Sequence, residues 1–187
     1  MARALFIDEN FIKENSELDE NIDMKLINPT IWYCQKAYIE KTLGTVLYDD
    51  ILAEIISDSD LSGQTAYLTL VDDYIADALL YWVLHELQVP LTYKMRNKSV
   101  GKNTDTNQTP VDFQEHKYLR DYYKPKAQYL TERLEAFLCA NQTDYPLYNT
   151  STEDDDLLPK QTAPQVAVYL GGKLPRRDKY GYYTEEI

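Results

Sequence analysis

The sequence contains few of the residues that carry metal and redox chemistry. It has 2 cysteines and 2 histidines among 187 residues. Cys34 and Cys139 both lie among apolar neighbours in helical patterns, which favours small buried side chains over a disulfide or a redox pair. His85 and His116 lack the spacing to a second histidine or a cysteine that a zinc site requires, and we interpret both as polar helix positions. We expect no metal, no cofactor and no catalytic residue.

Positive charge and long apolar runs are also scarce. The chain has 31 acidic and 19 basic residues, a formal net charge of -12. Because proteins bind nucleic acid mainly through Lys and Arg on phosphates, this balance argues against nucleic acid as the main partner. No segment approaches the roughly 18 uninterrupted apolar residues of a membrane span, and the N-terminus has no signal-peptide pattern. We expect a soluble protein that is made in the cytoplasm and does not contact a membrane.

Two segments begin like ligand-binding loops but are incomplete. "DSDLSG", from Asp58, starts like a calcium loop, yet Thr69 stands where the bidentate glutamate belongs. We interpret it as a turn that caps the next helix. "SVGKNT" lacks the first glycine of a phosphate loop and has Asn103 at the magnesium-binding position.

Tyrosine is the abundant aromatic residue, with 17 copies against 4 Phe and 2 Trp. A tyrosine ring offers apolar area, and its hydroxyl needs a polar partner. Such side chains suit surfaces that are buried against another protein but still edged by water. Alternatively, the rings cover the flanks of the protein's own helices, and the composition favours neither explanation.

Apolar residues recur at helical spacing through most of the first 140 residues. A first helix is expected to begin near Pro29, with Asn28 as its N-cap, and to end at Gly44, a C-cap with positive φ. A second helix is expected from about Leu47 to Ile56. The break at Gly44 is therefore a joint between two helices.

Two longer helices are expected after this joint. The third, of roughly 23 residues, should end before Pro90, because a proline disfavours helical geometry in the residue before it. The fourth runs from about Val111 to Ala140 with a kink at Pro125, since its apolar positions keep their phase across the proline. Those positions are Leu119, Tyr122, Tyr123, Ala127, Leu130, Leu134, Phe137 and Leu138. The sequence predicts a mainly α fold, an antiparallel bundle of about four helices with a long kinked last helix.

A basic segment separates the third and fourth helices. Residues 91–110 have no periodicity, and between Thr92 and Gln108 the charged residues are four basic ones and Asp105. We expect a projecting loop that binds a partner. Its candidate contact residues are Tyr93, Lys94, Arg96, Lys98 and Lys102.

The composition changes after Ala140. Half of the 8 prolines and 3 of the 6 glycines fall in the last 47 residues, which cannot form a core of their own. We therefore expect two parts, a helical domain over residues 1–140 and an extended tail over residues 141–187. The tail should bind partners by strand addition, by arginine pairing with acidic surfaces and by tyrosines in shallow pockets. The residues concerned are Val166, Val168, Tyr169, Leu170, Arg176, Arg177, Tyr180, Tyr182 and Tyr183.

Two quoted stretches carry a family resemblance. "LFIDENFIKENSELDENIDMKLINP" is followed by a helix with "QKAYIEKTLGTVLYDDIL", a long apolar helix and a final amphipathic one. Over about residues 3–139 this arrangement resembles the head-to-tail connector proteins of tailed bacteriophages. The segment "FIDENFIKENSELDENID" is most similar to connector proteins from phages of gut Bacteroidetes, including the crAss-like group. In that family the break at Leu43–Gly44 sets how the first two helices fold against the third.

The resemblance implies a structural virion protein and no enzyme. Such adaptors form a ring, typically of twelve copies, that joins the portal to the tail at the head-to-tail junction and lines the DNA channel. The expected partners are the portal protein, neighbouring copies, further tail or ring proteins, and passing DNA without sequence readout. An acidic channel would let DNA slide, and the basic loop would dock on the portal, with a DNA contact as the alternative. A stand-alone helical protein-binding regulator remains the second interpretation, and an enzyme of unrecognised type the third.

Overall fold

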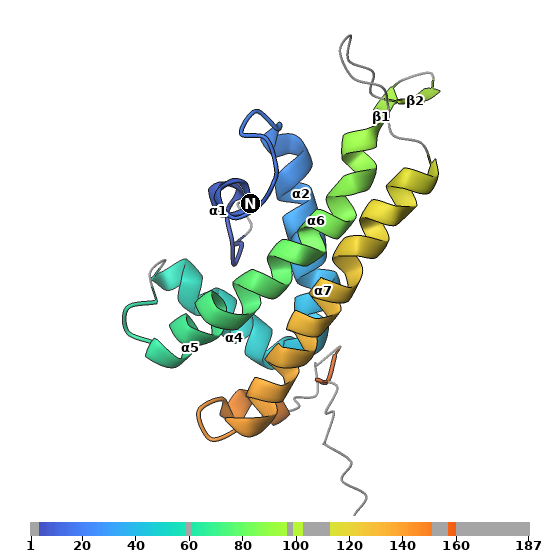
Figure 1. Ribbon diagram of the computed structural model, residues 1–187. Helices are drawn as coiled ribbons and strands as arrows, with labels where there is room; N and C mark the ends of the chain where they lie inside the picture. The colour runs from blue at the N-terminus through green and yellow to red at the C-terminus, as the bar shows by residue number, and fades with distance from the viewer. Residues whose placement is uncertain (1–3, 59–60, 97–98, 103–112, 151–156, 160–187) are drawn as a thin grey trace, which may run out of the picture.

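The computed structural model describes residues 4–58, 61–96, 99–102, 113–150 and 157–159. In these ranges the protein is mainly helical, which confirms the expected helical bundle (Figure 1). The α-helices are α1 (Glu9–Glu14), α2 (Met24–Cys34), α3 (Glu40–Leu43), α4 (Thr45–Ser57), α5 (Thr65–Leu70), α6 (Ala76–Thr92) and α7 (Phe113–Ala140). Two π-helical segments, η1 (Gln35–Ile39) and η2 (Val71–Ile75), join α2 to α3 and α5 to α6. Among the described helices, none has the length and apolar character to cross a lipid bilayer.

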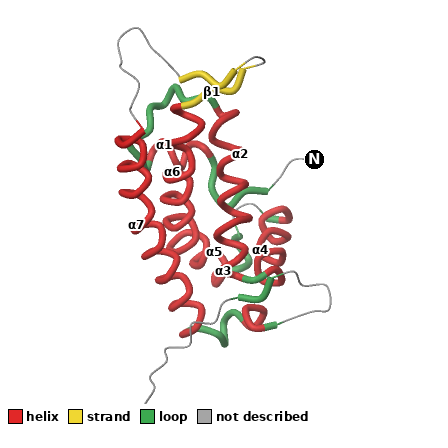
Figure 2. Tube along the Cα trace, turned by 90° about the vertical axis from the view of Figure 1, so that its right-hand side faces the viewer, coloured by secondary structure: helices red, strands yellow, loops and turns green. Residues whose placement is uncertain are grey.

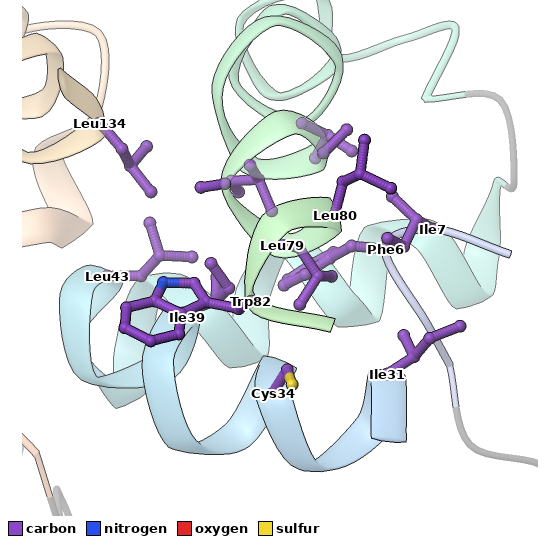
Figure 3. Packing of buried hydrophobic residues seen from close by; sticks show 14 of the residues in the cluster. Phe6, Ile7, Ile31, Cys34, Ile39, Leu43, Leu79, Leu80, Trp82 and Leu134 are labelled. Carbon is purple, nitrogen blue, oxygen red and sulfur yellow. The ribbon is translucent and has the colours of Figure 1, made fainter. Parts of the chain in front are cut away.

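The core lies where α6 packs between α2 and α7, and Figure 2 shows the three helices running side by side. In Figure 3, Leu43 of α3 points toward Leu134 of α7, and both side chains are fully buried. Trp82 and Leu79 of α6 fill the space beside Ile39. The apolar positions expected on the third helix thus face the core, because a 3.6-residue period places them on one side of α6.

The first long helix begins earlier than the sequence predicts. α2 starts at Met24, where the carboxylate of Asp23 accepts a hydrogen bond from the Lys25 N–H at 3.0 Å. Pro29 lies inside the helix, and Asn28 is not its cap. The aspartate satisfies an otherwise unpaired amide at the true start, and a proline in the second turn removes only one helical hydrogen bond.

The joint at Gly44 has the predicted conformation. Gly44 ends α3 with φ 80° and ψ 156°, and its N–H donates to the Glu40 carbonyl at 2.8 Å. The positive φ expected from the sequence is confirmed, and this ψ lies in a region that is essentially restricted to glycine. The next helix, α4, begins at the following residue, so the chain turns within a single residue.

The helix expected to end before Pro90 instead continues through it to Thr92. The hydroxyl of Thr92 donates to the Gln88 carbonyl at 2.8 Å, and the Gln88 amide donates to the Leu84 carbonyl at 3.2 Å. These side-chain bonds reinforce the last turns of the helix, and Pro90 removes only one backbone donor. The fourth helix is one continuous element that contains Pro125, as predicted, while its kink stays a prediction.

The packed core continues beyond Ala140, where the sequence analysis places the end of the helical domain. A short 3-10 helix, η3 (Pro146–Asn149), follows α7, and Tyr145 and Tyr148 on either side of its start are buried in the same core. The Tyr145 hydroxyl donates to the Ala66 carbonyl at 2.8 Å, which ties this segment to α5. Helical periodicity does not reveal this segment, because two large rings in a short turn create no helical repeat.

Candidate protein-binding surface

The expected basic loop is a β-hairpin that projects from the end of α6 (Figure 1). Strand β1 (Tyr93–Arg96) pairs antiparallel with β2 (Ser99–Lys102), and Tyr93 lies opposite Lys102. The sequence shows no alternation of apolar and polar residues that would predict these strands. Since a lone two-stranded hairpin is marginally stable in water, it would gain stability from lying on another surface.

Several predicted contact residues lie outside the described residues. They are Lys98 and the tail positions Val166, Val168, Tyr169, Leu170, Arg176, Arg177, Tyr180, Tyr182 and Tyr183. Their role as contacts stays a prediction.

A row of exposed tyrosines on α7 forms a surface that the sequence analysis did not single out. Tyr118, Tyr122 and Tyr129 are 71%, 47% and 67% exposed. Their spacing, i, i+4 and i+11, places them along one side of the helix. Tyr122 was expected on the core face, but the fully buried positions of α7 are Ala127, Leu134 and Leu138, so that assignment is corrected. Only a narrow stripe of α7 packs on α6. The apolar face that periodicity predicts is therefore wider than the face that is buried.

Two adjoining hollows lie beside these tyrosines, and we call them together the tyrosine groove. One, of about 610 Å³, is lined by Leu80 and Tyr81 of α6 and by Pro125, Tyr129 and Leu130 of α7. The other, of about 290 Å³, is lined by the loop after α1 and by Leu84, Tyr122 and Tyr123. Both share Asn15, Tyr81 and Lys126. A third hollow, of about 490 Å³, lies beside Tyr118 and Leu119 nearer the hairpin.

Lys126 occupies the centre of the tyrosine groove. Its ammonium lies 3.7 Å from the ring centroid of Tyr122, and the ring centroids of Tyr81 and Tyr123 are 5.6 and 5.9 Å away. A hydrogen bond with Tyr122 raises the pKa of Lys126 above its usual value, so the side chain is charged at neutral pH. Cation–π attraction holds this charge over the rings and keeps them in a fixed arrangement.

Acidic residues border the groove. Glu14 and Glu17 line the smaller hollow, and Asp77 lines the larger one. Lys126 supplies one positive charge against these three carboxylates, so the charged residues that line the two hollows are negative in sum. The groove therefore combines aromatic walls with negative charge, which suits a segment that carries arginine or lysine beside apolar residues.

A polar cluster of His85, Glu86 and Arg120 connects α6 with α7. His85 on α6 and His116 on α7 are polar helix positions, as the sequence indicated, and both are buried, at 6% and 7% exposed. The Arg120 carbonyl accepts from His85 Nδ1 at 3.0 Å, which leaves Nε2 to accept from the Arg120 guanidinium at 3.2 Å. The same guanidinium lies 3.5 Å from Glu86. The partners of His85 are internal, which indicates a structural role for this histidine.

Tyr38 extends the cluster to the first helical stretch. Its hydroxyl donates to the Glu86 carboxylate at 2.7 Å, and its ring stacks on Trp82 at a centroid distance of 3.7 Å. Burial, together with this bond to a carboxylate, raises the pKa of Tyr38 well above its usual value. The neutral phenol is thus part of the folded structure.

The other candidate chemical groups also have internal roles. Cys34 is a fully buried free thiol whose pKa is raised by burial and by the charge of Glu86, as expected of a small core side chain. The carboxylate of Asp58 accepts hydrogen bonds from the N–H and hydroxyl of Ser62, which closes the turn itself rather than capping α5. In the part of the chain that the structure describes, no group of three or more His, Cys, Asp or Glu could hold a metal.

Comparison with known proteins gives one match. The model of a family described as a family of unknown function, DUF6712, matches residues 39–156. This range contains α6, the hairpin and α7, whereas residues 160–187 lie beyond it. No curated protein and no solved structure matches the chain.

Proposed function

The chain belongs to DUF6712, a family of unknown function, and we propose that it is a structural virion protein, one subunit of a homo-oligomeric ring that joins the portal to the tail. The resemblance of residues 3–139 to phage connector proteins suggests this role. The observation that carries it is the presence of two unlike features on one subunit, the hairpin that projects from the end of α6 and the tyrosine groove. A ring subunit that also binds the portal requires unlike surfaces, because it meets neighbouring copies and the portal through different faces.

Each surface has the chemistry that such an assembly needs. The hairpin projects beyond the helical bundle (Figure 1), and its residues Lys94, Arg96, Lys98 and Lys102 would dock on an acidic surface of the portal. The groove walls are tyrosines, a residue type enriched in protein interfaces. The net charge of -12 would let DNA pass the ring without adhering to it.

The first test is the mass of the purified full-length protein, alone and mixed with the portal protein of the same phage. Native mass spectrometry should give a multiple of 21.8 kDa, either alone or only with the portal. Cryo-electron microscopy of the virion should then place the protein at the head-to-tail junction. A protein that stays monomeric with the portal present and is missing from the virion contradicts the proposal.

A charge reversal tests the portal contact. Changing Lys94, Arg96, Lys98 and Lys102 to Glu should abolish portal binding and leave the circular-dichroism melt unchanged. The matched control reverses four exposed lysines elsewhere, Lys25, Lys41, Lys117 and Lys124, and should retain binding. If the hairpin variant binds the portal but particles lose their DNA, the hairpin contacts DNA instead.

The second candidate function is a stand-alone helical regulator that binds one protein through the same tyrosines. The groove favours it as much as it favours a ring contact, since both need an aromatic surface. A monomeric mass together with capture of a single partner, lost on Tyr129→Ala, would support this alternative.

A further inference from the structure

The tyrosine groove and the third hollow lie one after the other beside α7. The two hollows that share Asn15, Tyr81 and Lys126 adjoin each other, and the third lies further along at Tyr118. From Gln114 to Leu130 this side of α7 measures about 24 Å at 1.5 Å per residue. An extended segment of about seven residues has the same length. The tyrosine groove together with the third hollow therefore matches the length of a short extended peptide.

The chemistry of the groove specifies its occupant further. Tyrosine rings accept the planar guanidinium of arginine and the apolar side of another tyrosine, and the rim carries Glu14, Glu17 and Asp77. An acidic segment would be repelled by that rim. The occupant should thus carry arginine or lysine, tyrosine and small apolar residues within a short extended stretch.

The last 28 residues of this chain have that composition. Residues 160–187 contain five basic and three acidic side chains, a net charge of +2, whereas residues 1–159 carry -14. Within them, "LPRRDKYGYY" places Arg176 and Arg177 next to three tyrosines. Opposite charge and shared aromatic content make this segment complementary to the groove.

We propose that the tyrosine groove binds residues 160–187 of a neighbouring copy of this chain, with Arg176 and Arg177 toward the acidic rim. This inference rests on the proposed function, because it needs a second copy beside the first. The segment follows Pro159, which contacts the joint at Gly44, where the Thr45 N–H donates to the Leu157 carbonyl at 3.1 Å. Twenty-eight residues can extend about 90 Å, which is long enough to reach the next subunit.

Crossing between copies fits a ring better than folding back. A segment that leaves at the α3–α4 joint of one copy and enters the α6–α7 groove of the next links unlike surfaces in one direction. Repeating such a link closes a cycle, whereas a segment that returns to its own groove would leave each copy without this connection.

The test uses the full-length chain with the photo-crosslinking residue p-benzoylphenylalanine in place of Tyr129. After irradiation, a denaturing gel should show covalent dimers and larger species, and mass spectrometry should map the link to residues 160–187. The control places the same residue at Tyr33 on α2, which is 50% exposed and does not line the groove, and should give little linkage to this segment. A crosslink to residues 160–187 at monomer mass would overturn the inter-copy assignment, and a link to α7 of another copy would overturn the occupant.

A charge change checks the recognition. Arg176→Glu with Arg177→Glu should lower the crosslink yield several-fold, while Glu185→Gln with Glu186→Gln, in the same segment, should not lower it. Equal yields from both variants would overturn the role of the arginines. Native mass measured on each sample separates the two hypotheses. A ring mass without the crosslink refutes this inference alone, and a monomeric mass with portal present refutes the proposed function.

Discussion

Replacing Gly44 by alanine should destabilise the protein more than a glycine substitution normally does. The backbone at Gly44 has φ 80° and ψ 156°, which costs a residue with a Cβ about 1–3 kcal/mol. A Cβ built there would also lie 2.7 Å from Cδ of Pro159, closer than such atoms approach. Together these effects should lower the free energy of unfolding by about 2–3 kcal/mol, and Gly44→Val should lower it further because valine is β-branched.

Thermal and urea unfolding at fixed protein concentration measure this change. For a chain of this size, each kcal/mol corresponds to about 2–4 °C in Tm, so Gly44→Ala should melt roughly 5–10 °C below the wild type. Gly63→Ala is the matched control, because no atom lies within 4 Å of its Cβ position and its φ is not positive. That variant should stay within about 0.5 kcal/mol of the wild type.

A double-mutant cycle separates backbone strain from the close contact. In the Pro159→Ala background, Gly44→Ala should cost about 1 kcal/mol less, because the ring atoms that the Cβ meets are gone. The reasoning is refuted if Gly44→Ala and Gly63→Ala have the same melting temperature. If Gly44→Ala lowers the free energy of unfolding equally in both backgrounds, backbone strain explains the loss and the contact with Pro159 does not.

Three further changes test the core. Gln35→Leu should cost about 1–3 kcal/mol in urea unfolding, because the buried Gln35 amide accepts from the Phe6 N–H at 3.1 Å, and leucine leaves that N–H unpaired. A chain that ends at Ala140 should melt lower by circular dichroism than one that ends at Thr150, because it lacks two buried tyrosines; equal melts would contradict this. Folding also raises the pKa of Tyr38 above its usual value of 10.0, so above about pH 10 the unfolded chain releases this proton first and stability falls as pH rises. Tyr38→Phe should therefore make the alkaline decline in Tm shallower, and an unchanged slope would contradict the assignment.

The arrangement of helices along the chain was predictable because it depends on local patterns. Apolar residues three and four apart marked the stretches that became α6 and α7, since one face of a helix must be buried. Gly44 marked a joint because glycine tolerates positive φ, and the structure has φ 80° there. The excess of tyrosine over phenylalanine allowed either rings that bind another protein or rings that cover the flanks of the helices, and it did not indicate that Tyr122 and Tyr129 stay exposed.

Other features follow only from how the helices pack together. Propensity rules count only the proline, so they did not predict that Pro29 and Pro90 lie inside helices. The carboxylate of Asp23 caps α2 before Pro29 by accepting from the Lys25 N–H, and the side chains of Gln88 and Thr92 donate to carbonyls in the last turns of α6. The hydrogen-bond partners of Gln35 were equally unpredictable from the sequence. Its amide pairs with the N-terminal segment and with the Tyr48 hydroxyl, contacts that exist only after distant segments meet.

The tyrosine groove shows the same division. The sequence by itself determined that the protein is an acidic helical bundle rich in tyrosine, because charge, periodicity and composition are properties of the chain alone. Tertiary structure decided which tyrosines remain uncovered, because burial on α7 depends on how much of its surface α6 can reach. It also decided that Lys126 stands among three rings contributed by α6 and α7, since residues 81, 122 and 123 meet only when the two helices pack side by side.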